Sequence, residues 1–294
     1  MANLKEIQRK IGSVKNTQKT TRAMKLVSSA KLTRAKELAE HSRAYAGKIT
    51  EMIQDIASNI AKKGDMMDNP YFKEVKNPKI VDIIMVTADK GLCGGFNSQT
   101  IKNVTKMLKK YDSEGAKVRL RVIGKKGISY FKFNDIDMIQ TIDDLSSAPT
   151  YKRAAEFIGE VVDDYMQNKT DKVIIVHNGY VNMITQEIRK EQALPVDASK
   201  VSVDAVSTSD LELEPDDDDT LLEALVKRYL EYSMYYALID SLAAEHSARM
   251  QAMESATNNA KEMVDSLTIK YNKARQESIT TELIEIISGV ESMK

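Results

Sequence analysis

The first 60 residues carry apolar or small side chains at alternating steps of four and three positions, the repeat of a coiled-coil helix. This repeat begins with Ile7 and Ile11 and is aliphatic again at Ile53, Ile56 and Ile60. Between these ends, from residue 18 to residue 28, its positions are polar or small. The first proline of the chain is at position 70. We therefore expect one helix of about 55 residues within 1–62, roughly 80 Å long.

The end of the chain shows the same repeat, from Leu225 to Ser278. The last proline is Pro215, and no glycine follows it before Gly289. This pattern predicts a helix over 220–288 that is about 70 residues and about 100 Å long. Thr220 follows a run of aspartates and is the expected N-cap, with a glutamate three residues later completing a capping box.

Each predicted helix has one narrow apolar stripe, and the two stripes are most simply buried against each other. His246 lies on the second stripe, where a core histidine with satisfied hydrogen bonds is expected rather than a ligand. Because the residues between the helices return the chain, the pair is expected to be antiparallel. Four tyrosines cluster on the second helix at positions 229, 232, 235 and 236 and are interpreted as packing residues.

Residues 78–200 alternate between strand-like and helix-like segments, which is typical of an α/β domain with a largely parallel sheet. KIVDIIMVTAD, VRLRVIG and KVIIVHNG predict buried strands, whereas NSQTIKNVTKMLKKY and YKRAAEFIGEVVDDYMQ predict amphipathic helices. SYFKF, IDMIQTI and the segment ending at Pro195 are expected to be further strands. The predicted fold class is therefore a long antiparallel coiled coil of the terminal helices, with a small Rossmann-like α/β domain inserted between them.

Charge is distributed unevenly although the formal net charge is +0. Residues 1–48 hold twelve Lys and Arg against three Glu, and residues 204–219 hold eight Asp and Glu without a basic residue. Either run can be a solvated face, and the basic end can also meet an acidic or phosphate-bearing partner. We expect 204–219 to form an exposed acidic linker.

Composition argues against disulfide-bonded, metal-binding, membrane-spanning and secreted classes of protein. The single Cys93 excludes an internal disulfide, and the three histidines lack metal-ligand spacing, so no metal site is expected. No apolar run approaches the roughly 18–20 residues of a membrane span. The first residues lack a signal-peptide core, which predicts a cytoplasmic protein. No group of residues suggests catalysis or a cofactor.

Two glycine motifs suggest alternative functions. ADKGLCGGFNS follows a strand and opens a helix, but it lacks the lysine and serine or threonine of a phosphate-binding loop. We interpret it as a tight turn with Cys93 tucked inside. VIGKKGIS resembles the Gly-x-x-G clamp of KH domains, yet a strand leads into it where KH domains have a helix. A nucleotide-binding enzyme with a coiled-coil arm and a nucleic-acid-binding coiled coil remain the alternatives.

Four segments carry a resemblance to one family. ITTELIEIISG at 279–289, YNKARQ before it, KNTQKTTRAMKLV near the start and DKGLCGGFN in the middle resemble the gamma subunits of F-type ATP synthases. They occur in the order of that family and span nearly the whole chain. The chain departs from the family pattern at Val290, in place of alanine, at Lys90, in place of arginine, and in LELEPD at 211–216, where relatives often carry tyrosine in place of leucine.

The resemblance implies a rotary shaft without a catalytic site, cofactor or bound nucleic acid. The paired helices would stand inside a ring of three alpha and three beta subunits. The α/β domain would lie against the epsilon subunit and the membrane c-ring, on the cytoplasmic face of a bacterial inner membrane. The residues that would contact the ring are Met24, Lys25, Arg275, Gln276, Thr280, Glu282, Leu283 and Ile286. Leu213 and Glu214 would contact the c-ring or epsilon.

Overall fold

The computed structural model describes residues 4–63, 70–73, 75, 77–196 and 218–293. The chain divides into two compact units, one comprising residues 1–29 and 249–294 and the other residues 30–248. Two long helices, α1 (Leu4–Lys63) and α5 (Asp218–Glu291), contribute to both units. Most of the predicted acidic linker, together with Leu213 and Glu214, lies outside the described residues.

The larger unit is built on a five-stranded sheet with the strand order β3-β2-β1-β4-β5. The strands are β1 (Ile80–Val86), β2 (Lys117–Ile123), β3 (Gln140–Ile142), β4 (Lys172–Tyr180) and β5 (Gln186–Leu194). β1 to β4 are parallel, and β5 runs antiparallel to β4. The prediction of a largely parallel α/β sheet between two terminal helices is confirmed.

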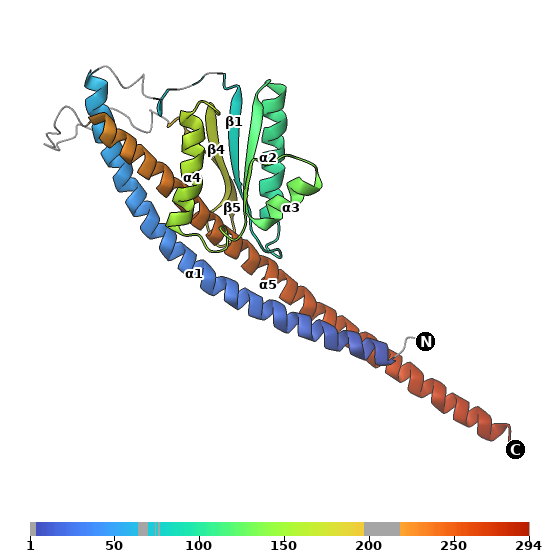
Figure 1. Ribbon diagram of the computed structural model, residues 1–294. Helices are drawn as coiled ribbons and strands as arrows, with labels where there is room; N and C mark the ends of the chain where they lie inside the picture. The colour runs from blue at the N-terminus through green and yellow to red at the C-terminus, as the bar shows by residue number, and fades with distance from the viewer. Residues whose placement is uncertain (1–3, 64–69, 74, 76, 197–217, 294) are drawn as a thin grey trace. The chain divides into compact units, whose positions relative to one another are not determined.

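Helices cover both faces of the sheet (Figure 1). α2 (Phe96–Ser113) and α3 (Lys125–Phe133) pack on one face, and α4 (Tyr151–Met166) packs on the other together with the first part of α5. The prediction of a strand at SYFKF was wrong, because these residues form most of α3. The run is short and apolar, and such runs do not distinguish a strand from a buried helical segment.

Polar contacts fasten α5 to the β4–β5 hairpin. The carboxylate of Asp240 lies 3.0 Å from Nε2 of His177, accepts a hydrogen bond from the backbone N–H of Tyr180 at 3.1 Å and pairs with Arg189 at 2.9 Å. His177 and Asp240 are both buried.

Tyr229, Tyr232 and Tyr235 of α5 pack against the core on the α4 face, as the packing interpretation predicted. The predicted N-cap was wrong, since α5 already includes the two residues before Thr220.

The same two helices pair within each unit. In the larger unit, Leu32 and Ala35 of α1 are buried with Ala243 of α5. In the smaller unit, the hydroxyls of Thr21 and Thr257 lie 2.7 Å apart, and Lys25 pairs with Glu254 at 2.6 Å. Residue numbers therefore rise along α1 as they fall along α5, which confirms the antiparallel pairing.

The seam of the smaller unit, by which we mean the line of contact between α1 and α5, buries little apolar surface, and we expect it to open readily. Thr21 and Ser28 are the buried residues of α1 in this unit, and a hydroxyl contact buries far less apolar area than a leucine does. In the isolated full-length chain, backbone amides of residues 15–30 should therefore exchange hydrogen faster than those of β1 and β4. Exchange as slow in 15–30 as in these strands would contradict this expectation.

Candidate functional site

The six predicted contact residues on α5 are all exposed. They are Arg275, Gln276, Thr280, Glu282, Leu283 and Ile286. Figure 1 shows α5 continuing beyond the N-terminal end of α1, and every residue from Ile279 to Met293 is exposed. On α1, Met24 and Lys25 are half-buried. The structure thus assembles these residues on two parts of one coiled-coil unit, a helix end and a segment one-third along α1.

The end of α5 carries an uncovered apolar surface. Six aliphatic side chains are 53–67% exposed: Ile279, Leu283, Ile284, Ile286, Ile287 and Val290. Four of them, at 279, 283, 286 and 290, follow the spacing that places side chains along one helix face. A row of large aliphatic side chains left in water is characteristic of a surface that binds another protein.

Polar groups lie immediately before this apolar row. The Thr280 hydroxyl donates to the carbonyl of Gln276 at 2.9 Å, as many helical threonines do. Arg275 forms no ion pair with any residue that the structure describes, and Lys273 pairs loosely with Glu277 at 3.9 Å. The Arg275 guanidinium is therefore available to a partner.

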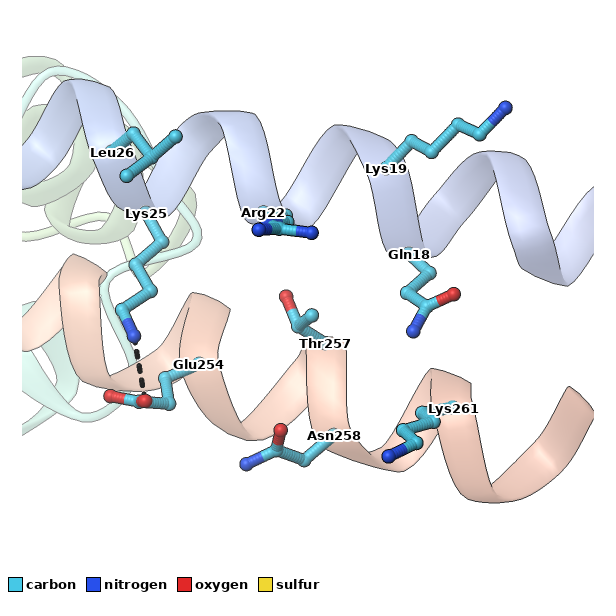
Figure 2. Close-up of a pocket in the computed structure, with 9 residues that line it drawn as sticks. All are labelled: Gln18, Lys19, Arg22, Lys25, Leu26, Glu254, Thr257, Asn258 and Lys261. Carbon is cyan, nitrogen blue, oxygen red and sulfur yellow. Dashed lines mark hydrogen bonds and ion pairs between the residues drawn. The ribbon is translucent and has the colours of Figure 1, made fainter. Parts of the chain in front are cut away.

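A basic recess lies between α1 and α5 around Lys25 (Figure 2). It has a volume of about 550 Å³ and is lined by Gln18, Lys19, Arg22, Lys25, Leu26, Glu254, Thr257, Asn258 and Lys261. Figure 2 shows Lys25 reaching across to Glu254 and Lys19 pointing away from α5. Among the described residues, Lys19, Arg22 and Lys261 have no acidic partner. The recess therefore carries an excess of positive charge.

Sequence reasoning identified only part of this recess. It named Lys25 but missed Arg22, Glu254 and Lys261. These three flank the seam positions Thr21 and Thr257, and the flanking positions of a heptad are where charged residues meet across two helices. The heptad pattern of each helix was visible in the sequence. The register between the two helices, which brings Lys25 to Glu254, was not.

The glycine-rich DKGLCGGFN segment forms a tight turn, as expected. The Asn97 side chain accepts a hydrogen bond from the Ala88 N–H at 2.9 Å and donates to the sulfur of buried Cys93 at 3.2 Å. Burial alone would raise the pKa of Asp89, but N–H groups of Lys125 and Asp144 and the Ser146 hydroxyl donate to its carboxylate and hold that pKa below its usual value.

The C-terminal helix fills the place where open α/β sheets bind nucleotides. In such sheets the ligand crevice lies beyond the carboxyl ends of the strands, where the strand order reverses, here between β1 and β4. Cys93 and Phe96 at this edge pack with Ala244 and Ala248 of α5 in one buried cluster. The crevice is thus occupied by the protein itself, which disfavours the nucleotide-binding alternative.

The second glycine motif is explained by packing. A Cβ on Gly124 would lie 2.0 Å from the carbonyl oxygen of Thr87, and one on Gly127 would lie 2.5 Å from the Met85 side chain. Both glycines let α3 approach the end of β1 closely. Since Gly124 comes directly after β2, the motif joins a strand to a helix and lacks the KH geometry.

Comparison with known proteins decides the family. The family described as ATP synthase matches residues 3–293. The gamma chain of ATP synthase from a Sulfurovum species is 68% identical over 295 residues and covers 100% of both chains. The chain belongs to the ATP synthase gamma chain family. The gamma chains from a Nitratiruptor species and from Sulfurimonas denitrificans are 60% and 58% identical, again over 100% of both chains.

Membership of this family makes the chain a non-catalytic subunit of ATP synthase, as the resemblance implied. Solved structures share its fold. The rotor of the Euglena gracilis mitochondrial ATP synthase matches with a TM-score of 0.62 and 17% identity, covering 94% of this chain and 98% of that chain. The central stalk and c-ring structure of the Tetrahymena thermophila enzyme contains a chain that matches with a TM-score of 0.61 and 22% identity, covering 81% and 99%. None of the helices within the described residues has the length and apolarity needed to cross a membrane.

Proposed function

We propose that this chain is the central rotary shaft of a proton-translocating F-type ATP synthase. It would couple rotation of a membrane c-ring to ATP synthesis and hydrolysis in the beta subunits. The observation that carries this proposal is the end of α5 in a member of the gamma chain family: fifteen consecutive exposed residues, Ile279 to Met293, with an apolar row beside exposed polar groups. The solved rotor and central-stalk structures that share the fold support it.

The mixed chemistry of this helix suits a rotating contact. A shaft inside a ring of three equivalent sites meets each site in turn, so every contact must form and break in each step. Exposed ion pairs and hydrogen bonds are individually weak, so the shaft can leave each rotational position without a large loss of binding free energy. We assign this role to Arg275, Gln276 and Thr280, opposite a loop of a beta subunit.

The other contacts follow from the same placement. Met24 and Lys25 would meet the same region of the ring from α1, where the basic recess suits a carboxylate-bearing surface. The aliphatic end from Leu283 to Ile287 would turn inside an apolar sleeve, and Glu282 would be a further contact with the ring. Aliphatic contacts without hydrogen bonds have no preferred angle of rotation, so they hold the axis while allowing it to turn.

The remaining partners are inferred from the family. The ring would contain three alpha and three beta subunits, and epsilon and the c-ring would bind the α/β domain, with Leu213 and Glu214 at that interface. The chain would then be a peripheral subunit on the cytoplasmic face of a bacterial inner membrane. Of the predicted acidic linker 204–219, the last two residues belong to α5, and residues 204–217 would serve as a linker between the sheet domain and α5.

ATP hydrolysis by purified alpha and beta subunits, with and without this chain, tests the proposal. We expect one copy of the chain in a native complex with three alpha and three beta subunits, and sustained hydrolysis only in its presence. Well-folded alpha and beta subunits that neither assemble with the chain nor gain activity would contradict the shaft function.

In that complex, Arg275→Ala should slow hydrolysis about tenfold, since losing a charge-assisted hydrogen bond costs roughly 1.5–3 kcal/mol and about 1.4 kcal/mol is a factor of ten. Thr280→Ala should slow it less. Thr281→Ala is the matched control, because Thr281 is also exposed and its hydroxyl makes the same bond to the carbonyl four residues earlier, at 2.9 Å. Equal effects of the two threonine substitutions would refute the assignment of Thr280.

A further inference from the structure

The two faces of the α/β domain carry opposite charge. α2 and α3 together contain seven lysines against one aspartate. α4 on the other face contains one lysine and one arginine against four acidic residues. A strongly basic layer on a protein whose formal net charge is +0 indicates a surface that binds an acidic partner.

Several of these basic side chains line a groove between α2 and α3. It has a volume of about 370 Å³ and is lined by Ser98, Ile101, Lys102, Thr105, Lys106, Lys109 and Tyr130. No acidic side chain lines it. Lys102, Lys106 and Lys109 are exposed and form no ion pair with any described residue. This distinguishes them from Lys110 of the same helix, which pairs with Glu114 at 3.7 Å.

Apolar side chains lie within and beside the groove. Ile101 is a buried lining residue, and Tyr130 lines the groove from α3 with 40% of its surface exposed. Phe133, one turn after Tyr130 on the same helix, is 87% exposed. Exposed aromatic residues beside cations are a composition found at protein interfaces, because they supply contact area at low entropic cost.

We propose that this groove, with Lys102, Lys106, Lys109 and Tyr130, binds an acidic helix of a partner polypeptide. The three lysines have the spacing i, i+4 and i+7, so they form one row about 10 Å long on a face of α2. A helix whose carboxylates repeat at the same spacing matches this row along its length. A compact anion such as phosphate would engage one end of it and leave the aromatic side chains uncovered.

This surface is separate from the coiled-coil contacts assigned above, and the inference stands on α2 and α3 alone. In the intact ATP synthase complex, the three lysines should react with an amine-acylating reagent about tenfold more slowly than in the free chain, since a carboxylate partner raises the pKa of an amine by about one unit. Lys152 on the acidic helix α4 is the control, and its rate should be unchanged. Carbodiimide, which joins an amine to a carboxylate in contact with it, should link these lysines to an Asp- and Glu-rich peptide of another subunit.

Charge reversal gives a second measurement. Lys102→Glu with Lys106→Glu should abolish the carbodiimide product at Lys109 while leaving the free chain as stable as the wild type, because both side chains are exposed. Equal acylation rates in the complex and in the free chain would overturn the proposal. So would protection of the lysines with carbodiimide products confined to this chain, or protection without any carboxylate product.

Discussion

Replacing Gly124 with alanine is expected to destabilise the α/β domain by about 3 kcal/mol or more. Gly124 has a φ of 101°, a conformation that side chains rarely adopt, and its Cβ would lie 2.0 Å from the backbone oxygen of Thr87. Neither strand end can withdraw, since Thr87 N donates to Ile123 O at 2.8 Å and Gly124 N to Ile142 O at 2.9 Å. Urea unfolding of the full chain, followed by tyrosine fluorescence, measures the loss.

Alanine substitutions at two other glycines distinguish the cost of the steric clash from the cost of backbone strain. Gly115 has a φ of 77° but nothing within 4 Å of a built Cβ, so Gly115→Ala should cost only the strain of roughly 1–2 kcal/mol. Gly159 lies inside α4, also with nothing within 4 Å, and Gly159→Ala should stabilise the protein by about 0.5–1 kcal/mol. If Gly124→Ala costs no more than Gly115→Ala, the close approach to Thr87 is not the reason for a glycine there.

The second large effect is expected from Arg121→Met, with a loss of about 3–5 kcal/mol. Arg121 is 3% exposed and its Nε lies 3.0 Å from the carboxylate of Asp82, whose side chain is fully buried. Burial raises the pKa of Asp82, and the charges of Arg119 and Arg121 oppose that rise. Removing Arg121 leaves a buried carboxylate with one remaining cation, since Arg119 lies 3.2 Å from its other oxygen. Urea unfolding again gives the change in stability.

A second substitution tests whether the buried carboxylate, left with one cation in place of two, is the cause of the lost stability. Asp82→Leu added to Arg121→Met removes both charges of the pair and leaves Arg119 with Asp164, so the double variant should be more stable than Arg121→Met alone. Lys152→Met on the exposed surface of α4 is the control and should change stability by less than about 0.5 kcal/mol. A double variant no more stable than Arg121→Met alone would refute this account.

Much of the candidate site could be predicted because the motifs that carry the family resemblance lie within short segments of the sequence. The aliphatic run at the end of α5 is visible in the sequence, but the assignment of Leu283 and Ile286 as contact residues came from the family resemblance, and their exposure in the structure agrees with it. Arg275, Gln276 and Thr280 came from the family resemblance, and their exposure agrees with a contact function. The basic groove on α2 was not found, because Tyr130 reaches it from another helix, one that the sequence analysis had predicted as a strand.

The sequence by itself determined the two long helices, the alternation of strands and helices between them and the family, because each of these depends on periodicity or motifs within one segment. Only the tertiary structure decided which residues meet. Thr21 contacts Thr257 across 236 positions, and a heptad repeat is compatible with several registers. Separately, packing of α5 over Cys93 and Phe96, with Asp240 bound to His177, fixes how the first part of α5 lies on the sheet domain. That arrangement fills the nucleotide crevice, a result that no local pattern could contain because it joins residues from three distant segments.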